Sequence, residues 1–406
     1  MGPPPHQPPP LPVDPLLEIV ARCDDAKSVI RCAAVSRPLR SAILDPGFRR
    51  RLGLRAAANG GFDPDLLMGV SFSLRPCSTV GDHSQQARHL RFDTDLLRSF
   101  ELVSSRDGLL VLRRNQEGPA GIRPANGVEL LVCNTITGHV SSLPKPGGSS
   151  IICRPAFLST GRSFELLVMY YRGNGIHPVT QIFSSEKAEW GAARRIHLPQ
   201  GVHPAVEATT TAPAVIGSNV HRLCSNIPNP FSLRVSDLFI LALHADAEQA
   251  TVISLPQDLP TSMMSGCNTS SSYAHSMILA ATEGGKSLSL IVAEKLVIAV
   301  WTLLPDEGTA ISSWSRQVVI RRGEIGRQLT SVMDAYQNIR FEVFGERSGT
   351  VVFWVRMGGL VQLNLGTKKA VVLWKGRDYN YLEARSFLSE VDLVSLLRGM
   401  KHFSII

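Results

Sequence analysis

The chain has 406 residues, of which 44% are hydrophobic and 19% charged, a composition that excludes a protein disordered throughout. The formal net charge of +8 favours acidic partners in general, but an aromatic content of only 6% argues against a stacking surface for nucleic acid. The best apolar candidate for a membrane span, residues 290–301, is short and is interrupted by Glu294 and Lys295. We therefore expect neither a nucleic-acid partner nor a membrane.

Residues 1–10 are proline-rich and lack the cationic start and apolar run of a signal peptide, so we expect a disordered tail. The seven cysteines form no Cys-x-x-Cys pair, and several lie among apolar residues. This usage is typical of reduced, buried cysteines in an intracellular protein. We expect the protein in the cytoplasm or the nucleus. The cysteines are at positions 23, 32, 77, 133, 153, 224 and 267.

The segment from Leu11 to Ile43 predicts three short helices. Asp14 is a suitable N-cap for the first, with Pro15 at the first helical position, where a missing N–H costs nothing. The second should begin at Asp24 or Asp25, and the third should follow Ser36 as its cap. Apolar residues recur at three- and four-residue spacing, which predicts one buried face per helix. These residues are Leu16, Ile19, Val20, Cys23, Val29, Ile30, Ala33, Ala34, Leu39 and Ile43.

A fourth helix can extend this module through residue 58, before Asn59, Gly60 and Gly61 interrupt it. The segment resembles an F-box, the three-helix module that docks on the Skp adaptor of cullin-RING ubiquitin ligases. It departs from the family pattern at Ser36 and Leu39 and by prolines at 15 and 38. The residues that carry the resemblance are Leu11, Pro12, Asp14, Leu16, Leu17, Glu18, Ile19, Lys27, Ser28, Ile30, Arg31, Cys32, Ala34, Val35, Arg40 and Ile43.

The resemblance implies that residues 11–58 bind a Skp-type adaptor and, through it, a cullin. A helix-to-groove contact depends on a few buried anchors, so a small apolar set should carry the binding. Some members of that set must instead hold the helices together. The alternative interpretation is a helical cap packed on the next domain. The expected adaptor-binding residues are Leu11, Pro12, Leu16, Leu17, Ile19 and Val35.

From about Phe72 the hydrophobic period becomes that of strands. Three segments share one pattern, in which an apolar strand, a polar turn and a return strand end in Leu-Pro. They are Glu129 to Pro144, Thr180 to Pro199 and Asp237 to Pro256, and their ends lie roughly 55 residues apart, a spacing typical of repeat folds. Further strand pairs without this ending follow, and the tryptophans lie in return strands.

Short strands with frequent turns and few helices indicate a large all-β domain, a sandwich, a barrel or a propeller, and the repetition favours a β-propeller over residues 72–388. Residues Ser104 to Pro144 are similar to the opening of the propeller-like domains that follow F-boxes in grass-type plant proteins. The number of blades stays open. For residues 389–406 we expect a short helix and a tail, because Val391, Val394, Leu397 and Met400 recur every third residue.

No motif in the sequence predicts catalysis, a cofactor or a metal. Gly284 to Ser287 (GGKS) lacks the earlier glycine of a phosphate-binding loop and leads into a strand, which favours a β-turn. His197, His221 and His244 lack ligand spacing and are expected at turns or on the surface. Nothing in the sequence brings a second acid beside Glu342 or Glu346.

We therefore expect a non-catalytic adaptor whose helices bind the Skp protein and whose β domain recruits an unidentified protein target. The alternative is an interaction scaffold with a degenerate F-box, favoured by Pro15, Ser36, Pro38 and Leu39. A catalytic propeller would need a cluster of acids or histidines at the mouth of its channel. Target specificity should lie in loops such as Pro76 to His89, Glu117 to Asn126 and Met263 to Ser272.

Overall fold

The computed structural model describes two units, which are treated separately below. The first comprises residues 1–68 and 390–406, and the second comprises residues 69–389, where the sequence predicted a β domain over 72–388. The structure describes residues 12–23, 26–58, 66–73, 96–114, 128–135, 138–147, 153–160, 163–172, 177–202, 206–207, 212–226, 237–259, 276–304, 313–328, 339–355, 359–374, 385–392, 394 and 397. Leu11 and the tail 1–10 lie outside these residues.

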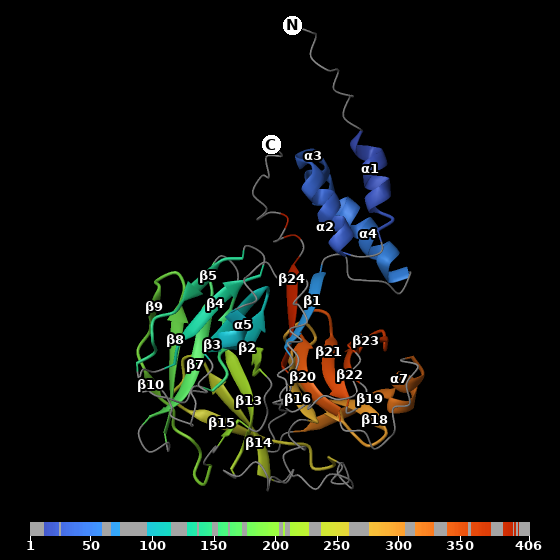
Figure 1. The fold of residues 1–406 in the computed structure, drawn as a ribbon. Coiled ribbons are helices and arrows are strands. Elements are labelled where there is room, and N and C mark those ends of the chain that lie inside the picture. The colour runs from blue at the N-terminus through green and yellow to red at the C-terminus, as the bar shows by residue number, and fades with distance from the viewer. Residues whose placement is uncertain are drawn as a thin grey trace, which may run out of the picture. The chain divides into compact units, whose positions relative to one another are not determined.

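The first unit is helical and contains α1 (Val13–Val20), α2 (Ala26–Val35), α3 (Arg37–Ile43) and α4 (Pro46–Ala58) (Figure 1). Its core joins residues from all four helices with one residue near the C-terminus. Small and branched side chains at i and i+4 let the short helices approach closely. The buried residues are Val20, Ala21, Val29, Ala33, Leu39, Ile43, Phe48, Leu52 and Leu397.

The helix caps agree with the sequence at α3 and differ at α1. The Ser36 hydroxyl accepts a hydrogen bond from the Leu39 N–H at 3.3 Å, and Pro38 lies in the first turn of α3. The prediction that Asp14 caps α1 is wrong, because α1 begins at Val13 after Pro12 and Asp14 lies inside its first turn. An acid there still opposes the positive helix end. Asp45 caps α4, since its carboxylate accepts from two backbone N–H groups.

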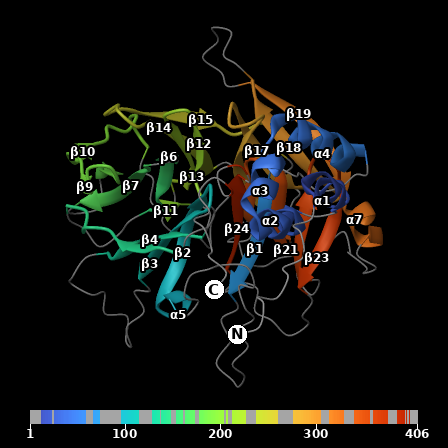
Figure 2. The same ribbon diagram turned by 90° about the horizontal axis from the view of Figure 1, so that it is seen from above.

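The second unit is a β-propeller of five antiparallel sheets, which follow one another round a ring (Figure 2). We number these blades in chain order. Blade 1 contains β2 (Phe100–Arg106), β3 (Leu109–Arg114), β4 (Leu130–Asn134) and β5 (Val140–Ser142). Blade 2 contains β6 (Ala156–Ser159), β7 (Glu165–Arg172), β8 (His177–Ser184), β9 (Glu189–Trp190) and β10 (Arg194–Arg195).

The remaining three blades repeat this order. Blade 3 contains β11 (Val206–Glu207), β12 (Ala214–Ile216), β13 (Asn219–Ser225), β14 (Leu238–His244) and β15 (Ala250–Ser254). Blade 4 contains β16 (Met277–Thr282), β17 (Ser287–Ala293), β18 (Val297–Leu303) and β19 (Trp314–Arg321), followed by α7 (Arg322–Gln328). Blade 5 contains β20 (Ile339–Gly345), β21 (Thr350–Val355), β22 (Gly359–Asn364) and β23 (Ala370–Trp374). A short helix, α5 (Leu96–Ser99), precedes blade 1.

The three Leu-Pro segments of the sequence are the outer halves of blades 1, 2 and 3. Glu129 to Pro144 forms β4 and β5, Thr180 to Pro199 forms most of β8 with β9 and β10, and Asp237 to Pro256 forms β14 and β15. The first strands β2, β6, β12, β16 and β20 contact one another in succession, which places them around the axis. Repetition in the sequence therefore marks the outer strands.

Each pair of consecutive blades shares one continuous apolar core. Blades 1 and 2 meet around Phe157, blades 2 and 3 around Met169, blades 3 and 4 around Ile240, and blades 4 and 5 around Phe353. All four side chains are 0–1% exposed. Because a blade cannot bury both faces alone, this stacking holds the ring together.

The last strand, β24 (Arg385–Asp392), pairs with β1 (Leu66–Ser73) in a separate two-stranded sheet. The prediction of a helix from Ser389 is wrong over residues 389–392, which are strand, whereas Val394 and Leu397 are helical. The period of three favours a helix, but pairing with β1, which lies far away in the sequence, makes these residues a strand. Within the propeller unit, the Ser105 hydroxyl donates to the Leu388 carbonyl at 3.0 Å, which ties β24 to β2.

Candidate functional site

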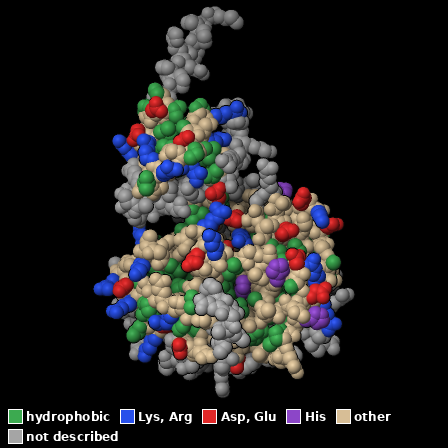
Figure 3. Space-filling model, turned by 180° about the vertical axis from the view of Figure 1, so that it is seen from behind, with side chains coloured by type: hydrophobic (Ala, Val, Ile, Leu, Met, Phe, Trp, Pro, Cys, Tyr) green, Lys and Arg blue, Asp and Glu red, His purple; other side chains and the backbone are tan. Residues whose placement is uncertain are grey.

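The predicted adaptor-binding residues differ in burial. Pro12 is exposed, and Ile19 and Val35 are exposed over 59% and 68% of their surface. Leu16 and Leu17 are only partly buried and pack on the helical core. Leu11 lies outside the described residues. Two large aliphatic side chains of the predicted set therefore face solvent, and hydrophobic and basic side chains lie side by side on the surface of the helical unit (Figure 3).

Helical spacing explains why these two residues face outward. In α1, Leu16 and Val20 define the inner face, and Ile19 lies about 60° from Leu16 and about 100° from Val20, at the edge of that face. The prediction that Ile19 lies on the buried face is wrong, because 59% of its surface is exposed. In α2, Val29 and Ala33 define the inner face, and Val35 is offset from both. A single exposed aliphatic residue is common in proteins, but two on neighbouring helices merit a functional explanation.

Leu54 on α4 is a third large aliphatic residue at the surface, 69% exposed. Sequence reasoning missed it. Phe48 and Leu52, four residues apart, mark the buried face of α4, and Leu54 lies about 200° round the helix from Leu52. This angular offset from the buried face of α4 is the signal from which the sequence could have predicted the exposure of Leu54.

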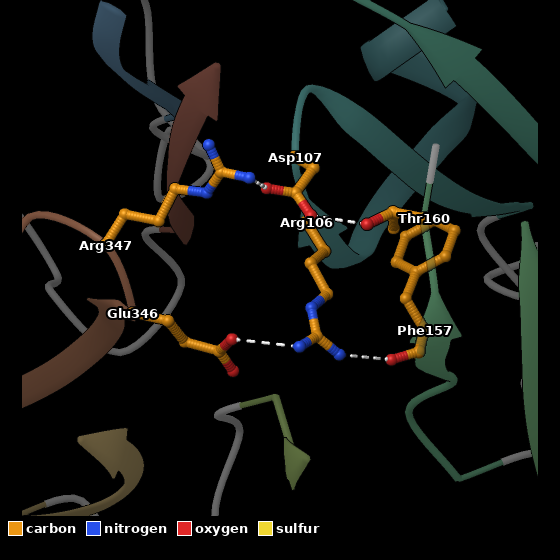
Figure 4. A network of polar contacts seen from close by, with 6 residues as sticks. All are labelled: Arg106, Asp107, Phe157, Thr160, Glu346 and Arg347. Carbon is orange, nitrogen blue, oxygen red and sulfur yellow. Dashed lines mark hydrogen bonds and ion pairs between the residues drawn. The ribbon is translucent and has the colours of Figure 1, made fainter. Parts of the chain in front are cut away.

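In the propeller, a polar network joins the first, second and fifth blades (Figure 4). Arg106, at the end of β2, forms an ion pair with Glu346 at 3.3 Å and donates to the Phe157 carbonyl at 2.7 Å. Asp107 forms an ion pair with Arg347 at 2.9 Å and accepts a hydrogen bond from the Thr160 hydroxyl. The pairs therefore link the turn after β2 to the turn after β20.

The charged groups of this network form ion pairs with one another. Its two arginines and two carboxylates are paired with one another, and their side chains are 26–44% exposed. Glu342 lies within β20 and pairs with Arg340 of the same strand at 2.8 Å, and both side chains are 4% exposed. Each acid named by the sequence analysis is therefore paired with an arginine, which stays protonated and favours the ionised form of the carboxylate.

The turns that carry this network lie on one face of the propeller. In an antiparallel blade, the turn between strands one and two and the turn between strands three and four are at the same end. A backbone hydrogen bond joins these two turns in four blades, from Thr135 to Gly108, Ser185 to Phe164, Ala245 to Ser218 and Leu365 to Gly349, at 2.8–3.0 Å. We call this end the turn face. Asp107, with φ of 47°, adopts the left-handed conformation that such turns require.

The strands that flank the loops 117–126 and 263–272 end at the opposite face of the propeller. The three loops proposed for target recognition lie outside the described residues.

Tryptophans connect neighbouring blades at the rim. The Trp190 indole N–H in blade 2 donates to the Pro144 carbonyl after blade 1, at 2.7 Å. The Trp314 indole N–H in blade 4 donates to the Ser254 carbonyl in blade 3, at 3.0 Å. Both acceptors lie in the Ser-Leu-Pro endings of the repeated segments, so these endings are inter-blade contacts.

The other candidate groups of the sequence have structural surroundings. The GGKS segment is the tight turn between β16 and β17, as predicted, with Glu283, Gly284 and Gly285 at positive φ. His221 is 8% exposed within β13, so its expected place at a turn or on the surface is wrong. Burial lowers the pKa of His221. Within the described residues, no group of three or more His, Cys, Asp or Glu side chains is placed to hold a metal ion.

The five described cysteines form no disulfide bond with one another, and Cys133, Cys153 and Cys224 are buried. Burial raises the pKa of the Cys133 thiol to about 11. Among the helices in the described part of the chain, none combines the length and the hydrophobicity needed to cross a membrane.

Comparisons with known proteins identify a family. The family model described as "Domain of unknown function (DUF7595)" matches residues 69–403. No curated protein matches the sequence. Among solved structures, the β-propeller domain of Cps50 (Swd1) from Myceliophteria thermophila is 10% identical, with 69% of this chain and 88% of that chain covered and a TM-score of 0.33.

Two further structures are similar at the same level. YjhT is 12% identical, with 68% of this chain and 84% of that chain covered and a TM-score of 0.36. A prolyl endopeptidase is also 12% identical, with a TM-score of 0.33, and the match covers 69% of this chain but only 36% of that chain.

Proposed function

Because the chain belongs to the family described as Domain of unknown function (DUF7595), we propose its activity from the structure: it is a non-catalytic substrate-recognition adaptor of an SCF-type cullin-RING ubiquitin ligase. In this proposal the helical unit is an F-box that docks on a Skp-type adaptor and thereby on a cullin. The β-propeller, a fold suited to protein interaction, recruits a protein target through its loops.

The observation that carries the proposal is the exposure of Ile19 and Val35. Both are among the residues that the resemblance to an F-box assigns to the adaptor. Burying an aliphatic side chain of this size on a partner is worth about 1.5 to 3 kcal/mol, so two such anchors are a substantial part of a binding free energy.

The departures from the F-box pattern have roles inside the helical unit. Ser36 caps α3, and Leu39 is 3% exposed in the helical core. Pro15 and Pro38 lie in the first turns of α1 and α3, where proline is tolerated. Ser36 and Leu39 therefore serve folding, which weakens the alternative of a degenerate F-box, whereas Pro15 and Pro38 are exposed and compatible with their helices.

The absence of catalysis in the proposal rests on the state of the charged groups. Each of the acids Asp107, Glu342 and Glu346 is paired with an arginine. These ion pairs lie within a strand or between blades of the propeller, a structural role that needs no catalytic step. The transfer of ubiquitin is then the work of the partners of this chain.

The test is co-purification of the intact chain with a Skp-type adaptor, comparing Ile19→Asp with Val35→Asp against Leu54→Asp. All three positions are exposed aliphatic residues, so none of the variants should unfold the unit. Leu16 and Leu17 are less suitable, because both pack on the helical core. We expect the first two variants to reduce adaptor binding at least tenfold and the Leu54 variant to bind normally.

Failure of the unaltered chain to bind the adaptor would leave the scaffold with a degenerate F-box as the better explanation. Equal binding by all three variants would place the contact elsewhere and contradict the role of Ile19 and Val35.

A further inference from the structure

One histidine of the propeller is buried within the protein. His221 of β13 is 8% exposed, whereas His139, His197 and His244 are exposed. Histidine is the side chain whose ordinary pKa lies in the range between pH 5 and pH 8. A buried imidazole is therefore a place where a small change of pH can alter the packing of the protein.

The strand register places His221 at the boundary between blades 3 and 4. Side chains alternate between the two faces of a strand, and β13 pairs with β14 without a register shift. Leu223, two residues after His221, belongs to the apolar cluster shared by blades 3 and 4, whereas Val220 and Cys224 belong to the cluster shared by blades 2 and 3. His221 therefore faces blade 4, whose first strand β16 contacts β13.

The immediate surroundings of His221 disfavour a positive charge. Its Nδ1 atom is buried and has no hydrogen-bond partner among the described residues, and neither has the indole N–H of Trp301 at the same boundary. Burial lowers the pKa of His221, and a hydrogen bond with the Ala214 backbone offsets this effect only in part. In the protonated ring both nitrogens are donors, so Nδ1 would carry a buried N–H without an acceptor.

The strands packed around His221 bring no carboxylate to the ring. Among β12, β14, β16 and β17, the titratable side chain is His244, which is exposed at the end of β14 and accepts a hydrogen bond from the Asp246 N–H at 3.1 Å. The remaining strand, β11, pairs with the other end of β13, where Glu207 is opposite Cys224. A protonated ring would therefore gain no opposite charge from these strands.

The charged groups at the ends of the neighbouring strands are exposed or already paired. Glu283 and Lys286 are exposed in the turn between β16 and β17, and Asp258 is exposed after β15. Glu294, which follows β17, forms an ion pair with Arg316 of β19. The described surroundings of the ring thus favour its neutral form.

We propose that His221 is a pH-sensitive switch of the propeller, whose protonation in mild acid opens the boundary between blades 3 and 4 while the other consecutive boundaries stay closed. The inference is independent of the proposed adaptor function. An opened boundary exposes the ring to water, where its pKa returns to the ordinary value of about 6.5. Opening is therefore favoured as the pH falls below this value, and above it the ring is neutral in both states.

The test is hydrogen–deuterium exchange of the intact chain at about pH 7.5 and about pH 5.5, with labelling times scaled to the intrinsic exchange rate at each pH. In the unaltered chain we expect the protection of β13 and β16 to fall about three- to tenfold at the lower pH, the range that one proton can supply there. The protection of β7 and β21 should change less than about twofold. His221→Gln should remove the difference, and His244→Gln, the same change at an exposed histidine of blade 3, should retain it.

The unaltered chain can overturn the inference without any variant. An equal loss of protection in all five blades would indicate general acid unfolding, and no local loss at the lower pH would show that the boundary stays closed. The same local loss in His221→Gln as in the unaltered chain would assign the pH dependence to another group. His221→Phe, which keeps an uncharged ring, takes the place of His221→Gln if the amide prevents folding.

Discussion

The interfaces between consecutive blades and the interface that closes the ring are built differently. Each of the four consecutive interfaces is one apolar cluster with contributions from both blades. Between the fifth and first blades, the described residues form two separate clusters, one around Trp354 in blade 5 and one around Leu110 in blade 1. Ion pairs at the turn face join these two blades instead.

Blades that are consecutive in the sequence therefore pack through apolar side chains. The first and last blades, which are neighbours only in space, are joined by ion pairs. Consecutive blades can share a core because their strands form one after another with local contacts. The first and last blades meet only when the ring is complete, and directional polar contacts then fix their register. We therefore expect the closing interface to be the weaker and more salt-sensitive one.

The largest effect is expected in a continuous core. Phe353 is 0% exposed and packs edge-to-face on Phe341, with ring centroids 5.9 Å apart. Phe353→Ala should lower the free energy of unfolding by about 3 to 5 kcal/mol, because it removes buried area and leaves a cavity. Urea unfolding measures the loss. A change below about 1 kcal/mol would mean that the interface between blades 4 and 5 is not a packed core.

Two glutamates of blade 5 give a matched comparison between buried and partly exposed pairs. Glu342→Gln leaves the 4% exposed Arg340 without its carboxylate, which should cost about 3 kcal/mol. Glu346→Gln breaks the pair with Arg106 at the closing interface, where solvent screens the charges, and should cost about 0.5 kcal/mol. Thermal unfolding at low salt and in 1 M NaCl measures both.

The salt series sharpens this comparison. We expect 1 M NaCl to remove the difference between the Glu346→Gln variant and the unaltered chain, and to leave most of the Glu342→Gln effect, since buried pairs are screened less. A salt-independent Glu346 effect would show that the closing interface is not maintained by ion pairs.

Loss of a hydrogen bond at the rim should lower the free energy of unfolding less than loss of a core side chain between consecutive blades. Trp190→Phe keeps an aromatic ring beside Phe183 but removes the indole N–H that donates to Pro144. We expect a loss of about 1 kcal/mol in unfolding free energy, the usual net value of one hydrogen bond. Trp190→Ala, measured in parallel, should cost more, because it also removes the ring.

Of these predictions, the titration of His221 should have the smallest effect on stability at neutral pH. Its pKa is lowered in the folded protein by burial, so the unfolded chain binds more protons below the ordinary histidine value of about 6.5. Stability should therefore fall as the pH decreases through this range. The melting temperature of His221→Gln, compared with the unaltered chain at pH 7 and pH 5, measures this contribution. An equal pH dependence in both proteins would contradict it.

The sequence predicted the parts of the fold that depend on local pattern. The strand, turn and Leu-Pro ending of Glu129 to Pro144 mark β4 and β5, and Ser36 marks the start of α3. It left the blade number open, because blades 4 and 5 lack the Leu-Pro ending and the inner strands carry no repeated signature.

The sequence could not predict the long-range contacts. Arg106 and Glu346 are distant in the chain and belong to no motif, so their pairing follows only from ring closure. The period of Val391, Val394 and Leu397 favoured a helix, but pairing with β1 makes residues 385–392 a strand. For the candidate docking residues, the sequence identified the apolar set, and only the packing of α1 and α2 separated Ile19 and Val35 from Leu16.

The pairing of β1 with β24 affects how the protein can be made. A ribosome produces β1 before the five blades and β24 after them. At about 5 to 20 residues per second, the first strand waits roughly 15 to 60 seconds for its partner. During that interval its backbone edge is available for wrong pairings, so chaperone capture of the nascent chain should concentrate on residues 66–73.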